Sequence, residues 1–188
     1  MDQPPIRIVR TDLLHANDRF KVVRDVQELP DGSLVEWESV VHRDSVLALP
    51  IDQDRHVYLV RQYRPQVGAE TLEVIGGGLD EGMTPAEGMH RELLEEAGIE
   101  ARLISLGTGD LGTATIRCRE HLFLAIVERI GEPSPEPFER LMRQRLERYS
   151  LERAVELVLD GTIRDANSRM TILMAAEHVR RHGLAPAE

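Results

Sequence analysis

A glycine cluster that leads into an acidic helix, between residues 76 and 99, constrains the fold of this chain more than any other segment. It reads GGGLDEGMTPAEGMHRELLEEAGI. Thr84 and Glu87 have the spacing of a capping box, with a proline at the first helical position between them. Gly98 stands where a helix usually ends in the left-handed conformation. These signals predict a helix over residues 85–97.

Two faces of this predicted helix differ in character. Spacings of three and four place Glu92 beside Glu95 and Glu96 on one face. A second face, expected to pack in the core, carries Ala86, Met89, Leu93 and Ala97. Like charges this close cost about 0.2–0.5 kcal/mol per pair, which a solvated acidic surface tolerates. We favour a metal site, because a glycine turn brings backbone carbonyls to the carboxylates and Mg²⁺ binds oxygen ligands of both kinds.

The segment resembles the Nudix box, the signature of hydrolases that cut a nucleoside diphosphate linked to another group. The matching positions are Gly77, Arg91, Glu92, Leu93, Glu95, Glu96, Gly98 and Ile99. One position departs from the pattern, because Met83 stands where the family has its first Glu. Methionine cannot accept a charge-assisted hydrogen bond from Arg91. Glu87, four residues before Arg91, is expected to replace that partner in part.

The resemblance also implies roles for these residues. Glu92, Glu95 and Glu96 would hold Mg²⁺, or Mn²⁺ as a substitute, together with the backbone carbonyl of Gly76. Arg91 would orient the glutamates, a role that suits a bidentate guanidinium. The bound ions would lower the pKa of a water molecule and neutralise the pyrophosphate as charge develops at phosphorus.

Segments outside the box resemble landmarks of the ADP-ribose pyrophosphatase branch of this family. They read EWESVVH, VYLVRQYRPQVG, TLEVIGGGLDEG and DGTIRDANSRMTILMAA. On these matches Arg64 and Glu73 are candidate substrate-binding residues, and Trp37 is a candidate for stacking on adenine. Ordinary structural roles remain open: a surface arginine at a strand end for Arg64, and sheet packing for Trp37.

A catalytic base is assigned in this branch to a Glu on a loop after the core. Three glutamates fall in or beside the matching stretch: Glu132, Glu136 and Glu139. We take Glu139 as the candidate, although the sequence does not choose among the three. A second departure lies in GDLGTATIRCRE, where Leu111-Gly112 replaces the Pro-Gly of the branch and Glu120 follows later than the family's Glu.

The pattern of the whole chain predicts an α+β fold, a mixed sheet with helices on both faces, and the resemblance implies that this is a Nudix-type α/β/α sandwich. Residues 6–42 alternate in strand fashion, with a turn at Pro30-Asp31-Gly32, and the resemblance implies that residues 1–42 supply a small N-terminal antiparallel sheet. Residues 43–188 form the Nudix domain. Its expected elements are strands in DSVLALPI, HVYLVRQYR, TLEV, ARLISLG and HLFLAIVER, a turn at Asp52–Arg55, a loop at GEPSPEP, a helix around LERAVELVLDG and a closing helix over 166–182.

Composition narrows the classes of partner. The formal net charge of −10 makes nonspecific nucleic-acid binding a poor expectation, because such binding needs a basic surface. Cys118 is the only cysteine, so no internal disulfide forms and a reducing cytoplasm is expected. No stretch approaches the roughly 18 apolar residues of a membrane span, so no membrane partner is expected.

Mg²⁺-dependent hydrolysis of a nucleotide sugar, namely ADP-ribose to AMP and ribose 5-phosphate, is the leading hypothesis. An enzyme for GDP-mannose or another nucleotide sugar is the first alternative. A non-catalytic nucleotide-sensing module, suggested by Met83, is the second. A homodimer is expected, because a small sheet with one apolar face cannot bury that face by itself, and residues 1–42 would cover a second copy.

Overall fold

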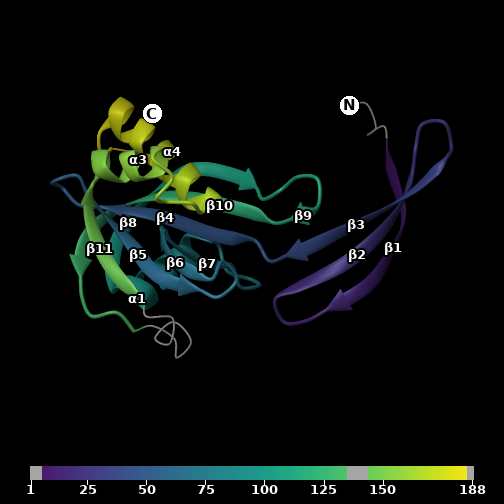
Figure 1. Ribbon diagram of the computed structural model, residues 1–188, viewed down its shortest axis with the longest axis horizontal. Helices are drawn as coiled ribbons and strands as arrows, with labels where there is room; N and C mark the ends of the chain where they lie inside the picture. Colours follow the sequence, from purple (N-terminus) through teal and green to yellow (C-terminus); the bar gives the residue numbers. More distant parts are fainter. Residues whose placement is uncertain (1–5, 135–143, 186–188) are drawn as a thin grey trace. The chain divides into compact units, whose positions relative to one another are not determined.

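The computed structural model describes residues 6–134 and 144–185, which fall into two compact units (Figure 1). The first comprises Met1–Asp44 and Gly109–Glu120, and the second comprises Ser45–Thr108 and His121–Glu188. Residues 109–120 therefore join the first unit, far in sequence from its other strands.

A four-stranded sheet in the order β1-β2-β3-β9 forms the first unit. Its strands are β1 (Arg7–Ala16), β2 (Phe20–Glu28), β3 (Leu34–His42) and the short β9 (Ile116–Arg117). The first three are antiparallel, whereas β9 lies parallel to β3. The predicted turn between β2 and β3 is present, with Gly32 at φ +83° and its N–H donating to Leu29 O at 2.9 Å.

Much of the apolar surface of this sheet is exposed in the single chain. The large apolar side chains concerned are Ile6, Ile8, Val9, Leu13, Leu14, Leu34, Val35 and Trp37. Leu13 and Leu34 are each 62% exposed. A two-layer unit would bury such side chains against a second element, so the sheet leaves apolar area available for another surface.

A seven-stranded sheet forms the second unit, with the order β11-β5-β4-β10-β8 and with β6 and β7 paired to β5 and β4. The strands are β4 (Ser45–Ile51), β5 (His56–Arg64), β6 (Ala69–Glu73), β7 (Ile75–Gly78), β8 (Ile99–Asp110), β10 (Arg119–Ile130) and β11 (Arg145–Ser150). The sequence pattern predicted these strands except β11 and β7, the latter because residues 76–78 were expected in a glycine loop but pair with β4. The predicted turn at Asp52–Arg55 closes through Arg55 N–H to Asp52 O at 3.0 Å.

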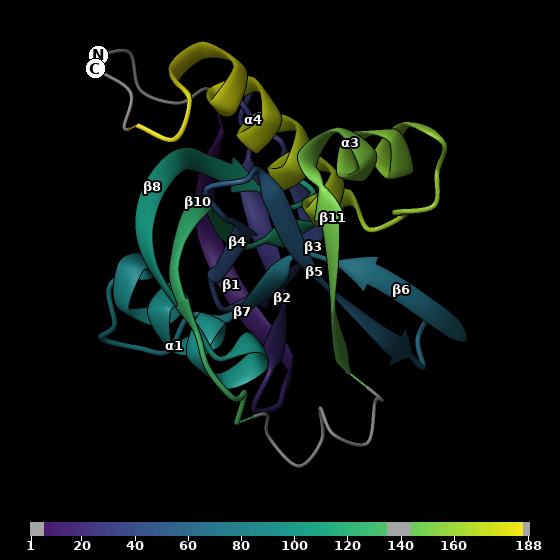
Figure 2. The ribbon, with the colours of Figure 1, turned by 90° about the vertical axis from the view of Figure 1, so that its left-hand side faces the viewer.

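Helices cover both faces of this sheet, as predicted. They are α1 (Pro85–Ala97), α3 (Leu151–Leu159) and α4 (Ala166–His182). Met89 and Leu93 of α1 pack with Val46 of β4 in one core cluster, while residues of α3 and α4 pack with other strand residues in a second. Figure 2 shows α1 on one side of the sheet and the other two helices on the opposite side. The described helices include none long and apolar enough to span a membrane.

One expected core residue of α1 is placed wrongly by the sequence pattern. Ala86 is exposed, whereas Met89, Leu93 and Ala97 are buried as predicted. The early contact of the helix is made instead through Gly88, where a Cβ would lie 2.7 Å from Leu79 Cδ1. The helix backbone therefore approaches Leu79 at Gly88, and Ala86 faces solvent.

Candidate active site

Both ends of α1 are fixed by the residues that the sequence singled out. The Glu87 N–H donates to Thr84 Oγ1 at 3.3 Å, and the Thr84 N–H donates to the Glu87 carboxylate at 2.8 Å, which completes the capping box. Gly98 ends the helix at φ 63°. Glu87 is thus committed to the cap, and the expectation that it pairs with Arg91 is wrong.

Arg91 instead pairs with Asp80 and Glu92. Its Nη1 donates to the Asp80 carboxylate and lies 3.4 Å from Met83 Sδ, while Nη2 donates to Glu92 Oε1 at 2.9 Å. Glu95 Oε2 lies 3.8 Å from Nε. The hydrogen bond to Glu92, followed by that to Asp80, raises the pKa of Arg91. The guanidinium therefore stays charged and links the glycine loop to the acidic face of α1.

The glycine loop makes room for Glu92. A Cβ on Gly77 would lie 2.5 Å from the Glu92 carboxyl carbon, and one on Gly76 would lie 2.5 Å from Val46 O. Glu92 itself is only 8% exposed. The Glu92 carboxylate is thus held against the Gly77 backbone, and a buried carboxylate offers the hard oxygen ligands that a divalent cation such as Mg²⁺ prefers.

Gly77→Ala is expected to lower the activity of this site on the order of ten- to a hundredfold, because the added methyl displaces the Glu92 carboxylate. Gly131→Ala is the matched control, since the nearest atom to its Cβ is 3.7 Å away. Steady-state kinetics on both variants, with thermal unfolding to confirm folding, makes the comparison. Equal activity of the two variants would contradict the inferred packing.

Glu95 and Glu96 are partly exposed on the same helix. Within the described residues, the three glutamates do not bring an oxygen each within 4.8 Å of one another, while Asp52, Asp54 and His56 do bring such ligand atoms together. Repulsion between like charges opposes closer approach of the glutamates. The three glutamates thus offer separate carboxylate ligands along one face of the helix.

The Asp52 group has a structural explanation. Asp52 Oδ1 accepts from the N–H groups of Asp54 and His56 at 3.0 and 2.9 Å, and Oδ2 accepts from Tyr58 and Arg148 at 3.0 and 2.7 Å. Burial alone would raise the pKa of Asp52, but these hydrogen bonds lower it. The carboxylate thus stabilises the turn between β4 and β5, and the cluster needs no ion.

Arg64 and Glu73 lie together at the wall of a pocket of about 330 Å³ in the second unit. Arg64 donates to both oxygens of Glu73, at 3.0 and 2.5 Å, and Thr71 Oγ1 donates to Glu73 at 2.5 Å. Burial would raise the pKa of Glu73, yet these hydrogen bonds lower it. The hydrogen bond to Glu73, with a smaller contribution from the charge of Glu96, raises the pKa of Arg64. Arg64 is therefore not a free surface arginine.

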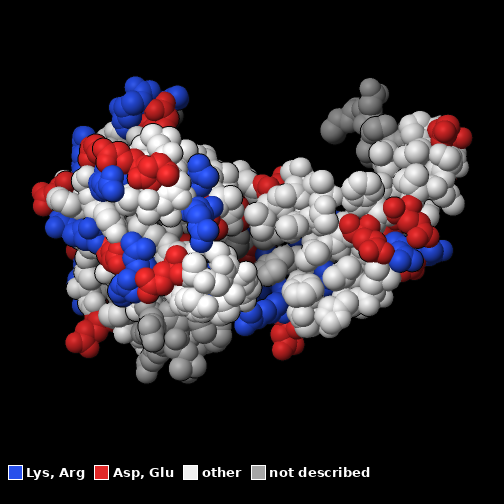
Figure 3. Space-filling model, viewed as in Figure 1, with Lys and Arg blue, Asp and Glu red and all other residues white. Residues whose placement is uncertain are grey.

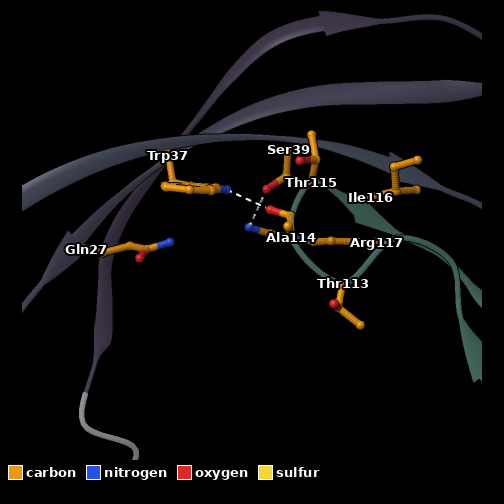
Figure 4. A pocket seen from close by; sticks show the side chains of 8 residues that line it. All are labelled: Gln27, Trp37, Ser39, Thr113, Ala114, Thr115, Ile116 and Arg117. Carbon is orange, nitrogen blue, oxygen red and sulfur yellow. Dashed lines mark hydrogen bonds between the residues drawn. The ribbon is translucent and has the colours of Figure 1, made fainter.

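Trp37 lines a separate pocket of about 340 Å³ within the first unit. Its Nε1 donates to Ala114 O at 2.8 Å, and the residue is 50% exposed, so packing within the chain does not bury it. Figure 4 shows Trp37 of β3 and Gln27 of β2 facing the loop that carries Thr113 and Ala114. The indole is fixed in direction while part of its surface stays open.

The segment with the Leu111-Gly112 departure forms the wall of this pocket. Arg117 donates to the fully buried Asp25 and to Ser39 Oγ, and the Val40 N–H donates to Thr115 O at 2.9 Å. These contacts hold residues 109–120 against the first sheet. The departure is visible in the sequence but this role is not, because the partners lie more than 70 residues earlier in the chain.

The proline-rich segment follows β10 in the sequence and begins in contact with the C-terminal end of α1. The Gly131 N–H donates to Gly98 O at 2.8 Å, and the Ser134 N–H donates to Glu95 O at 3.0 Å. Glu132 is exposed in this stretch. Glu136 and Glu139, the latter our candidate base, lie outside the described residues. Residues 131–134 thus run alongside the C-terminal end of the acidic helix, and the segment with Glu136 and Glu139 follows them in the sequence.

Comparison with known proteins identifies the class to which this fold and this helix belong. A model of the NUDIX domain matches residues 41–170, more than half of the chain. The chain belongs to the Nudix family. It is a Nudix hydrolase of the ADP-ribose pyrophosphatase-like branch, and its two-sided α/β/α architecture is that of the family.

Three similar proteins place the chain within the family. An ADP-ribose pyrophosphatase of Mycobacterium tuberculosis is 29% identical over 190 residues, covering 98% of this chain and 89% of that protein. An ADP-ribose pyrophosphatase of Bacillus subtilis is 28% identical over 155 residues, 80% of each chain. A crystal structure of an ADP compounds hydrolase aligns with a TM-score of 0.82 over 98% of this chain and 100% of that chain, at 21% identity, which supports the fold.

Proposed function

We propose that this protein hydrolyses the pyrophosphate bond of ADP-ribose, giving AMP and ribose 5-phosphate, with Mg²⁺ held by the acidic face of α1. The observation that carries the metal requirement is a charge balance. The site holds three arginines against six carboxylates: Arg64, Arg91 and Arg164 against Glu73, Asp80, Glu92, Glu95, Glu96 and Asp165. Such a surface repels a pyrophosphate unless cations reverse its field.

Charge on the wider surface does not supply that reversal. Figure 3 shows basic and acidic side chains interspersed over the second unit on the face in view. Within the second unit, arginines pair with carboxylates, as Arg145 does with Glu70 and Arg148 with Asp52. Local ions at α1 are therefore the simplest source of positive charge for the substrate.

In this proposal Glu92, Glu95, Glu96 and the carbonyl of Gly76 hold the ion, and Mn²⁺ can replace Mg²⁺ because both prefer oxygen ligands. The bound ion supplies activation of a water molecule and neutralisation of the phosphates. Arg91 orients Glu92 through the hydrogen bond at 2.9 Å. Glu139 is the proposed general base that accepts the proton of the attacking water.

We assign the pocket of Arg64 and Glu73 to the sugar phosphate end, because a guanidinium beside a carboxylate can bind phosphate and hydroxyl groups. Trp37, in the segment 1–42 that we propose covers a second copy of the chain, is the proposed stacking partner of adenine, because an indole offers a face for stacking. The names of the two ADP-ribose pyrophosphatases support this substrate.

A substrate panel separates this proposal from its alternative, a GDP-mannose or other nucleotide-sugar pyrophosphatase. ADP-ribose, ADP-glucose, GDP-mannose and UDP-glucose are compared by kcat/KM at saturating Mg²⁺. We expect ADP-ribose to be preferred by at least about tenfold, or ~1.4 kcal/mol. A preference for GDP-mannose would assign the chain to the alternative.

We further propose that a second copy of this chain covers the apolar surface of β1 and β3, with C₂ symmetry as the default. The protein is expected to sediment as a dimer at micromolar concentration. Leu13→Glu combined with Leu34→Glu should shift it toward the monomer, because both side chains are 62% exposed in the single chain. Exchange of exposed Leu159 for Glu is the control, since it lies in the second unit. A wild-type protein that sediments as a monomer would rule out the dimer.

A further inference from the structure

Asp80 and residue 83 meet the same end of the Arg91 guanidinium. Arg91 Nη1 donates to the Asp80 carboxylate, and the same nitrogen lies 3.4 Å from Met83 Sδ. A thioether sulfur is a weak acceptor, whereas a carboxylate makes a charge-assisted hydrogen bond. The interaction that position 83 makes poorly is therefore made well by Asp80, three residues earlier in the glycine loop.

The other end of Arg91 points toward the metal-binding face. Nη2 donates to Glu92 Oε1 at 2.9 Å and to Gly78 O at 3.4 Å. A guanidinium is planar, so fixing Nη1 also fixes the direction of Nη2. Without a partner on Nη1 the side chain could rotate, and the Glu92 carboxylate would lose a fixed donor. The orientation of Glu92 thus depends on what binds the far side of Arg91.

No second carboxylate in the described part of the chain is hydrogen-bonded to Nη1. Glu87, the nearest candidate by sequence spacing, is committed to the N-cap through Thr84. Glu95 approaches Nε instead, at 3.8 Å. Asp80 therefore stands alone among the described acidic residues in holding this nitrogen.

We propose that Asp80 is a positioning residue that replaces the first Glu of the family motif: it holds Arg91, and Arg91 in turn aims Glu92 at the divalent cation. This inference rests on the proposed function for its kinetic consequences. It predicts that a carboxylate at position 83 can substitute for the one at position 80, because either side chain would accept a hydrogen bond from Arg91 Nη1.

The test is a set of four proteins: wild type, Asp80→Asn, Met83→Glu and the double variant. Asp80→Asn should lower kcat on ADP-ribose by about tenfold and raise the Mg²⁺ concentration for half-maximal activity by a similar factor. Met83→Glu alone should equal or exceed wild type. The double variant should recover to within about threefold of wild type, because the new carboxylate binds the vacated nitrogen.

Glu81→Gln is the matched control. Glu81 is exposed and adjacent to Asp80, so its exchange for Gln removes one negative charge from the same loop. Mn²⁺ binding without substrate, followed by electron paramagnetic resonance, gives a readout separate from activity. We expect weaker Mn²⁺ binding in Asp80→Asn, recovery in the double variant and no change in Glu81→Gln.

Two outcomes would overturn the proposal. In the first, Asp80→Asn behaves like Glu81→Gln. In the second, the folded double variant shows no stronger Mn²⁺ binding and no higher turnover than Asp80→Asn. Thermal unfolding of every variant identifies any that fail to fold. If Asp80→Asn does not fold, an active double variant supports the proposal and an inactive, folded one refutes it. A wild type that does not hydrolyse ADP-ribose refutes the proposed function, while Mn²⁺ binding still decides the role of Asp80.

Discussion

Exchange of Glu95 or Glu96 for Gln is expected to reduce turnover of ADP-ribose at least about a hundredfold, a loss of ~2.7 kcal/mol in transition-state stabilisation. The amide keeps the size of the side chain but removes the negative charge that binds the cation. Both residues lie on the partly exposed acidic face of α1, beside the buried Glu92. The effect should therefore fall on kcat and on the Mg²⁺ requirement more than on folding.

Glu100→Gln is the control for this pair of variants. Glu100 follows the helix and makes an exposed ion pair with Arg129, an interaction of small energetic value. Kinetics are measured over a wide Mg²⁺ range, so that weakened binding and lost turnover are distinguished. Near-wild-type turnover of both Glu95→Gln and Glu96→Gln at saturating Mg²⁺ would remove the metal assignment.

Trp37→Ala should raise KM for ADP-ribose by about five- to a hundredfold, because stacking of a base on an aromatic side chain contributes ~1–3 kcal/mol. The change should leave kcat much less affected, since stacking on the base is made equally in the bound substrate and in the transition state. Trp37 has a fixed indole and an open surface, which is the arrangement that stacking requires.

Trp37→Phe is the matched variant, because it keeps an aromatic face while losing the hydrogen bond to Ala114. It should retain most of the affinity. Ribose 5-phosphate, which lacks the base, provides a second comparison as a competitive inhibitor whose inhibition constant Trp37→Ala should not change. If Trp37→Ala leaves KM for ADP-ribose unaltered, the base binds elsewhere.

Local signals account for the parts of the fold that the sequence predicted well. The helix at residues 85–97 was predicted to the residue, since its capping box and terminal glycine lie within the segment itself. The closing helix over 166–182 was predicted equally well. For the hairpin at Pro30-Asp31-Gly32, the turn residues alone specify a conformation with positive φ at glycine.

The parts that were missed depend on contacts between distant segments. Strand β11 carries alternating charged residues that resemble a loop, yet Glu147 pairs with Arg61 of β5, 86 residues away. Residues 109–120 join the first unit through Arg117 and the buried Asp25. The pairing of Arg91 with Asp80 depends on how the glycine loop folds back on the helix, which spacing does not encode.

The central claim is that this chain cleaves ADP-ribose at the pyrophosphate bond with the help of a divalent cation. Phosphorus NMR of ADP-ribose incubated with the purified full-length protein tests it directly, with Mg²⁺ present and with the metal removed by chelation. The account predicts that the pyrophosphate signals are replaced by those of AMP and ribose 5-phosphate only when Mg²⁺ is present. Intact ADP-ribose in both samples, or equal cleavage without a divalent cation, would contradict it.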